Sequence, residues 1–296
     1  MQQNVSILGC GVATMDIYGN LHRMYPGGNE YNVACNAAKL GARAGFLGVF
    51  GDDLAGRLLE ETLISQQVDV SHCHHEQGSS GYSLVELKPD GDRVFLMWNR
   101  EGVTDLHPIQ FTEEELDYAR SFDVLSCGRL ADISKDKLQL LSRQGIALCY
   151  DFHAAFTREE VAEIAPMVRY AFFSCSHLTE EEIREYLSLA CECGCVLAVG
   201  TRGVEPVIAY DGKRFYRQET QRVIPTDTLG AGDSYIAGVL VNYLQLTAKG
   251  IAQEAAVQQA LKNAAIHSAG VVCIEGSIGV GFDADAERLG EIVHLR

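Results

Sequence analysis

The chain has 296 residues, and 47% of them are hydrophobic, which is enough to bury a large core. Its 24 Lys and Arg residues against 40 Asp and Glu residues give a formal net charge of −16, which argues against nucleic acid and membrane surfaces as partners. No apolar run reaches the roughly 18 residues of a membrane span, and the first residues lack the basic and apolar regions of a signal peptide, so we expect a cytoplasmic protein.

Strand-like and helix-like segments alternate along most of the chain. The expected strands lie at 5–9, 46–50, 82–87, 93–98, 124–127, 147–151, 170–174, 195–199, 207–210 and 214–217. The expected helices lie at 29–40, 54–66, 135–143, 158–165, 179–193, 233–245 and 253–269. The turn residues at 89–92 and at 211–212 each join two of the strands into a hairpin.

Such alternation predicts an α/β fold with a mostly parallel sheet that helices cover on both faces. No internal repeat, low-complexity tract or linker divides the chain, so we expect a single domain over residues 1–296. The hairpin within residues 81–103 and the short segment 17–26 are candidates for a flap on the sheet. In an open α/β sheet the ligand binds beyond the carboxyl ends of the strands, which is where a site is expected.

The stretch 226–234 reads TDTLGAGDS and leads into a helix. Gly230 and Gly232 let the backbone turn free N–H groups toward one point, which makes an anion site suited to phosphate. Asp233 would repel that phosphate, and the conflict is resolved if it takes a proton from a hydroxyl that then attacks the phosphorus. The alternative is that Asp233 only caps the helix, since Asp and Ser are favoured at helix starts.

A second group of polar residues follows the first strand. Asp16 comes soon after this strand, Gly27 and Gly28 open the next helix, and Asn32 lies one turn further along it. Amides and a carboxylate that converge at strand ends suit a ligand with several hydroxyls, which needs both donors and acceptors. The alternative is a glycine turn with an asparagine cap, and further asparagines exposed to solvent.

With Asp16, Gly-Gly-Asn-x-x-Asn at 27–32 and Asp-Thr-x-Gly-Ala-Gly-Asp at 227–233 in this order, the chain resembles the ribokinase (PfkB) family of sugar kinases over nearly its whole length. The resemblance implies a three-layer α/β/α ribokinase-like fold with a mostly parallel central sheet and a small β lid, formed by about 17–26 and 81–103. It also implies a kinase that uses ATP and Mg2+ to phosphorylate a primary hydroxyl of a sugar-type substrate, and often a loop that binds a monovalent cation such as K+.

The resemblance also implies roles for single residues. Asp233 would be the catalytic base, and the amides of Gly230, Ala231 and Gly232 would stabilise the phosphoryl group in transfer. The sugar-contacting positions would be Asp16, Gly27, Gly28 and Asn32. The nucleotide positions would be Thr201, Gly203, Asp227 and Thr228, with Asn263 and His267 near the adenine. As a pair at i, i+4, the last two are equally consistent with ordinary helix residues.

Three departures from the family pattern stand out. The family's Asn-x-x-Glu motif, which orders the Mg2+ waters, should fall near 173–181, but it is altered here, so the metal ligands are unknown. Pro206 stands where a glycine is usual, which stiffens that loop. The short interval from Asp16 to Gly27, with the Arg-Val-Phe and Glu-Gly-Val pattern at 93–103, looks most like the fructoselysine 6-kinase branch.

Kinases of that branch act on a sugar–amino-acid adduct, which carries a carboxylate and an ammonium. Arg100, after the flap hairpin, and Arg129, after the strand at 124–127, are the candidates for binding such a carboxylate. The alternative is that both are solvated surface charges. A plain sugar, a sugar acid and a nucleoside remain alternative acceptors.

Other classes fit the sequence less well. The chain lacks the third glycine that an NAD-type dehydrogenase has after its first strand. It also contains no Walker-type phosphate loop. A non-catalytic sugar-binding protein on the same fold stays open, because the fold does not fix function. The cysteines at 191–195 lack the second pair of a zinc site, so reduced thiols are expected. A homodimer through the flap strands, common in the family, is left undecided by the sequence.

Overall fold

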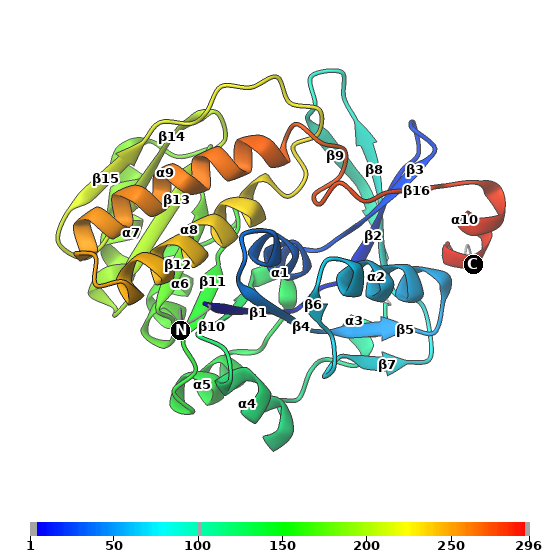
Figure 1. Ribbon diagram of the computed structural model, residues 1–296, viewed down its shortest axis with the longest axis horizontal. Coiled ribbons are helices and arrows are strands. Elements are labelled where there is room, and N and C mark those ends of the chain that lie inside the picture. The colour runs from blue at the N-terminus through cyan, green and yellow to red at the C-terminus, as the bar shows by residue number, and fades with distance from the viewer. Residues whose placement is uncertain (1–4, 100–101, 294–296) are drawn as a thin grey trace.

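The computed structural model describes residues 5–99 and 102–293. In this part of the chain a large sheet lies between two layers of helices, and a smaller sheet stands at one end as a lid (Figure 1). The fold is therefore the three-layer α/β/α arrangement that the sequence predicted. No helix within these ranges is long and apolar enough to cross a membrane.

The large sheet has nine strands among the described residues, in the order β15-β14-β13-β12-β11-β10-β1-β4-β6. Neighbours from β13 to β6 run parallel, and β14 and β15 are antiparallel additions at one edge. The strand bounds are β1 Ser6–Cys10, β4 Arg43–Leu47, β6 Val68–Asp69, β10 Val124–Gly128, β11 Leu148–Asp151, β12 Tyr170–Ser174, β13 Leu197–Arg202, β14 Glu205–Tyr210 and β15 Phe215–Gln218.

Helices cover both faces of this sheet because successive strand residues point to opposite sides. Ile7 of β1 packs into the core formed with α1, α8 and α9, whereas the adjacent Leu8 packs with the helices of the other face. Helices α8 and α9 lie side by side across one face (Figure 1). The bounds are α1 Asn29–Lys39, α2 Leu54–Ser65, α3 Val103–Leu106, α4 Glu113–Arg120, α5 Lys135–Arg143, α6 Arg158–Ile164, α7 Glu180–Glu192, α8 Ala231–Ala248, α9 Gln253–Val271 and α10 Ala286–Ile292, with 3-10 turns η1 Arg129–Ala131 and η2 Ala165–Met167.

The lid sheet joins segments from distant parts of the sequence. Its order is β16-β3-β2-β8-β9, and β2 pairs parallel with β8 so that Asp16 lies opposite Ser83. The bounds are β2 Thr14–Tyr18, β3 Arg23–Gly27, β8 Gly81–Leu87, β9 Arg93–Trp98 and β16 Phe282–Asp283; a separate pair consists of β5 Val49–Gly51 and β7 His74–Glu76. The side chains from Val94 to Trp98 on β9 are exposed.

Two local expectations differ from the structure. Residues 17–26 were expected as one short segment, but they belong to a β2–β3 hairpin that begins at Thr14. The strand expected at 46–50 is two strands, β4 and β5, with a break at Gly48. A Cβ at this glycine would lie 2.5 Å from the ring of Phe46, so no larger residue fits there.

Candidate active site

Helix α8 begins at a turn that requires glycine. Gly230 precedes the helix with φ 73°, and a Cβ on it would lie 2.5 Å from the Cβ of Ser277. Gly232 is exposed, and a Cβ on it would meet nothing within 4 Å. The N–H of Ala231 donates to the carbonyl of Thr228 at 3.3 Å, whereas the N–H groups of Gly230 and Gly232 have no backbone acceptor among the described residues. With open space beside Gly232, these two donors suit an anion.

Asp233 lies in this first turn but does not cap the helix, because no backbone N–H of the described residues donates to its carboxylate. Its Oδ2 instead accepts a hydrogen bond from Asn32 Nδ2 at 2.7 Å, and Asn32 Oδ1 accepts one from Ser277 Oγ at 2.6 Å. No described residue donates to Oδ1 of Asp233, so this oxygen is left for a ligand hydroxyl. The helix-cap alternative is thus not supported, and the Asp233 carboxylate instead contacts Asn32, a candidate for the sugar side.

Asp16 occupies a matching position on β2 of the lid sheet. Its Oδ1 accepts a hydrogen bond from Ser83 Oγ, and Oδ2 lies so close to Gly27 that a Cβ there would collide with it. Gly28 has φ 116°, and a side chain on it would strike the carbonyl of Val12. Both glycines are therefore needed to bring α1 against the Asp16 carboxylate.

Both acids are buried, and the charge of Asp16 acts on Asp233. Burial raises the pKa of Asp16 to about 7, although Ser83 and Arg93 favour its ionised form. Burial likewise raises the pKa of Asp233 to about 7, against the hydrogen bond from Asn32. Charges on Asp16 and Asp151 raise the pKa of Asp233 further. A carboxyl with a pKa near neutrality can accept a proton and release it again, as a catalytic base must.

Two further acids form the floor of the site. Glu30, in the first turn of α1, accepts a hydrogen bond from the N–H of Val12 at 3.2 Å, and burial raises its pKa to about 8. Asp151 at the end of β11 also has a raised pKa because it is buried, although the N–H of His153 donates to it at 2.9 Å. A Cβ on Gly128 would touch both side chains, so the two carboxyls lie near each other.

A cavity of about 700 Å³ opens on the other side of the glycine turn. Thr201, Gly203 and Thr228, the candidates for the nucleotide side, line it together with Gly232 of the glycine turn. Helix α9 contributes a wall of mostly small residues: Ala265, Ser268, Ala269 and Val272 just beyond its end. A cavity that ends at the free amides of α8 can hold a long anionic ligand with its phosphates at the turn.

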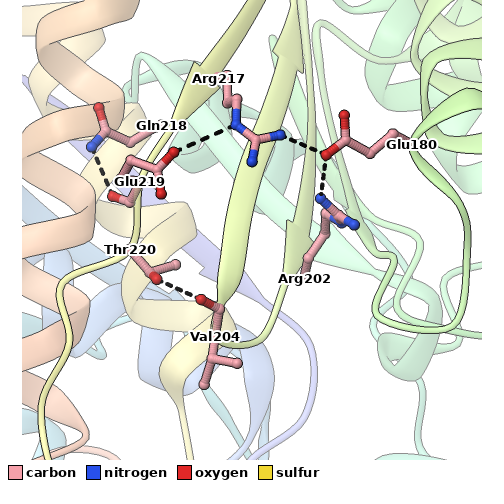
Figure 2. Close-up of polar contacts among 7 residues, drawn as sticks. All are labelled: Glu180, Arg202, Val204, Arg217, Gln218, Glu219 and Thr220. Atoms are coloured by element: carbon pink, nitrogen blue, oxygen red, sulfur yellow. Dashed lines mark hydrogen bonds and ion pairs between the residues drawn. The ribbon is translucent and has the colours of Figure 1, made fainter.

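The rim of this cavity includes Arg217, whose partner Glu180 belongs to the range 173–181 where the altered Asn-x-x-Glu motif was expected. Glu180, at the start of α7, accepts hydrogen bonds from Arg202 Nη1 at 3.0 Å and Arg217 Nη1 at 2.5 Å (Figure 2). Thr220 Oγ1 donates to the carbonyl of Val204 at 2.6 Å and fastens the adjoining loop (Figure 2). The described residues contain no cluster of His, Cys, Asp and Glu that could hold a metal ion. A protein-held Mg2+ therefore does not fit this rim, where two arginines already neutralise the acid.

Asp227 connects three segments of the chain through hydrogen bonds. Its carboxylate accepts hydrogen bonds from the N–H groups of Leu229 and Gly276 and from the hydroxyl of Tyr18, at 2.8 to 3.0 Å. It therefore joins the turn before α8 to the lid and to the loop after α9.

Arg93 belongs to the site, although its role was not recognised in the sequence. Its Nη1 donates to Thr228 Oγ1 at 2.8 Å, and its charge acts on both Asp16 and Asp233. The Arg-Val-Phe pattern was the one signal that pointed to this position.

Asn263 and His267, expected near the adenine, are not among the residues that line the cavity. Asn263 Nδ2 donates to Asn242 at 2.7 Å, and His267 Nε2 shares a 2.9 Å hydrogen bond with Asn36. Both side chains point away from the cavity, because the α9 residues that line it lie on the opposite side of the helix. They instead join α9 to α8 and α1.

The two arginines expected to bind a substrate carboxylate have separate outcomes. Arg129 forms an ion pair with Glu160 of α6, and no described residue of the sugar side contacts its guanidinium. Its role in substrate binding remains a proposal that would require this pair to open. Arg100 lies outside the described residues.

Fold and site together define a carbohydrate kinase, a phosphotransferase with an alcohol acceptor. The chain belongs to the pfkB family of carbohydrate kinases, whose family model matches residues 13–277. It is 31% identical over 278 residues to the fructosamine kinase FrlD of Bacillus subtilis, with 94% of each chain covered. It is also 31% identical to the fructoselysine 6-kinase of Escherichia coli, over 77% of this chain and 85% of that one.

Solved structures agree with the fold. The ribokinase of Arabidopsis thaliana, solved with ribose and ATP, superposes with a TM-score of 0.73 at 18% identity. The superposition covers 94% of this chain and 95% of that one. The ribokinase-like fold expected from the motifs is therefore confirmed.

Proposed function

We propose that this chain is an ATP-dependent kinase that phosphorylates a primary hydroxyl of a sugar–amino-acid adduct of the fructoselysine type. The observation that carries the proposal is the Asp233 carboxylate, which lies beside the 230–232 amides with one oxygen left open by the described residues. The relatives named for fructosamine and fructoselysine favour an adduct over a plain sugar as the acceptor.

The transfer follows from the positions of these groups. Asp16 binds one hydroxyl of the acceptor and holds the sugar, while Oδ1 of Asp233 accepts the proton of the primary hydroxyl. The freed oxygen forms a bond to the γ-phosphorus of ATP, and the bond from this phosphorus to the bridging oxygen breaks. The bonding electron pair leaves with ADP, and the 230–232 amides stabilise the charge on the moving phosphoryl group.

ATP is assigned to the 700 Å³ cavity, with its phosphates at the glycine turn and its base along the small residues of α9. Magnesium, when it arrives with the nucleotide, neutralises phosphate charge. Since the rim provides no acidic cluster for it, the ion would be held chiefly by the phosphates and water.

The acidic floor also favours an aminated acceptor. Neither Glu30 nor Asp151 forms an ion pair with a lysine or arginine of the described chain. The linkage between a sugar and an amino acid contains a secondary ammonium, which two nearby carboxyls would stabilise. With a neutral sugar such as fructose the Glu30 carboxyl would stay protonated at neutral pH, whereas a bound ammonium would favour its ionised form.

The test is ADP release by the purified protein with ATP and a panel of fructoselysine, fructose, ribose and adenosine. We expect the highest kcat/KM for the adduct. A preference for fructose, ribose or adenosine would reject the adduct and keep the kinase, whereas no turnover with a panel extended to sugar acids would favour a non-catalytic sugar-binding protein.

A further inference from the structure

We propose that Arg93, on strand β9 of the lid, is the cation that binds the phosphoryl group during its transfer, an inference that rests on the proposed kinase function. The lid would then do more than cover the sugar, because it would complete the phosphate side of the site.

The lid hairpin docks directly on the turn that precedes α8. Arg93 Nη1 donates to Thr228 Oγ1 at 2.8 Å, and the N–H of Thr228 donates to the carbonyl of Gly91 at 3.1 Å. Thr228 also lines the nucleotide cavity. The guanidinium thus lies at the boundary between the lid and the place where the phosphates would end.

The donors of Arg93 are not fully used. Its Nε is buried and has no hydrogen-bond partner in the described part of the chain. Buried donors are nearly always paired, so an unpaired one calls for an explanation. An oxygen of a bound phosphoryl group would satisfy it, and the planar fork of arginine suits such an oxyanion better than a lysine would.

The other charged groups around the site make this cation necessary. Asp16, Glu30, Asp151 and Asp233 are buried acids with raised pKa values, and an anionic phosphoryl group would bring further negative charge beside them. Arg93 is the basic residue whose charge acts on both Asp16 and Asp233.

Of the other arginines near the nucleotide cavity, Arg222 lines it with an exposed side chain, whereas two more are already engaged. Arg202 and Arg217 are held by Glu180, at the place where the altered magnesium motif would have contributed (Figure 2). Arg93 forms no ion pair with a described residue. It can therefore turn to a phosphoryl oxygen without breaking an ion pair. It makes no covalent bond and moves no proton; it shifts a hydrogen bond from the Thr228 hydroxyl to the phosphoryl group.

The test compares wild type, Arg93→Ala and Arg93→Lys with Lys88→Ala as a matched control. Lys88 is a cation of the same hairpin that pairs with Asp92 at the surface. We expect Arg93→Ala to lower kcat by roughly 100-fold to 1000-fold. The KM for the acceptor should change by less than about threefold, and Arg93→Lys should recover only part of the loss. Thermal unfolding confirms that each variant is folded.

Added guanidinium ion separates a chemical role from a structural one. It should raise the kcat of Arg93→Ala by about tenfold, because the ion can occupy the space of the missing side chain, and it should leave Lys88→Ala unchanged. A normal kcat in Arg93→Ala, or a loss confined to the acceptor KM, would overturn the proposal.

A binding measurement keeps this test distinct from that of the function. ADP with aluminium fluoride mimics the phosphoryl group in transfer and needs no turnover. If no acceptor is phosphorylated by the wild type, the proposed function fails, but calorimetry with this mimic still decides the role of Arg93. Weaker binding to Arg93→Ala supports it, and equal binding refutes it.

Discussion

Replacing Asp233 with asparagine should stabilise the protein at alkaline pH while it removes the base. Burial raises the pKa of Asp233 from 3.8 to about 7, a shift of about 3 pH units. At about 1.4 kcal/mol per unit, keeping the ionised acid in the fold costs up to about 4 kcal/mol. Asparagine has the same shape, accepts the Asn32 hydrogen bond and carries no charge, although it must be desolvated itself. We expect a net gain of about 1–3 kcal/mol at pH 8.

The raised pKa also determines the pH range over which the two proteins should differ in stability. Because the folded-state pKa of Asp233 is raised, its favourable contribution is complete below about pH 4 and is lost as the pH rises through 7. Thermal melts of both proteins should therefore differ by about 2–6 °C at pH 8, by less as the pH falls below 7, and should converge near pH 4. Asp16 and Glu30 titrate in both proteins, so their effects largely cancel. An equal or lower melting temperature for the variant at pH 8 would refute the reasoning.

Three further outcomes are expected. The kcat/KM of the wild type should fall about tenfold per pH unit below 7, since protonated Asp233 cannot accept a proton; a flat profile from pH 5 to 8 would contradict this. Gly230→Ala should lose about 2 kcal/mol or more in urea unfolding and most of its turnover, because of its φ of 73° and the clash with Ser277; native-like values would show that the turn tolerates a side chain. Trp98, the one tryptophan of the chain, pairs with Ser83 beside the sugar side, so the acceptor should change its fluorescence more than ATP does; the reverse order would misplace the sugar.

Local motifs predicted much of the site because single turns determine it. Glycine is required before α8 and before α1 because of the backbone angles and close contacts there. A side chain at either of these positions would clash with its surroundings. The alternation of strands and helices could also be predicted, because the hydrophobic pattern of each element depends on its own residues. This alternation predicted the parallel sheet.

The partners of these residues could not be read from the sequence. Ser83 and Ser277 reach Asp16 and Asn32 only through pairing across the lid and a loop beyond α9, and nothing in their local sequence indicates this. Arg93 begins a strand that continues as an exposed apolar run, so its burial depends on how the lid docks.

The expected positions on α9 depend on which face of the helix meets the cavity. A helix presents several faces, and tertiary packing decides which one meets the nucleotide cavity. Asn263 lies on the side that packs against α8 and α1, whereas Ala265 and Ser268 face the cavity.

The most direct measurement of the central claim is single-turnover phosphate transfer from ATP to fructoselysine by wild type and Asp233→Asn at pH 8. We expect the wild type to form a phosphomonoester at the primary carbon. The variant should bind ATP with similar affinity and form the product at least about 1000-fold more slowly. Product formation by the variant at a rate close to that of the wild type would contradict the assignment of Asp233 as the base.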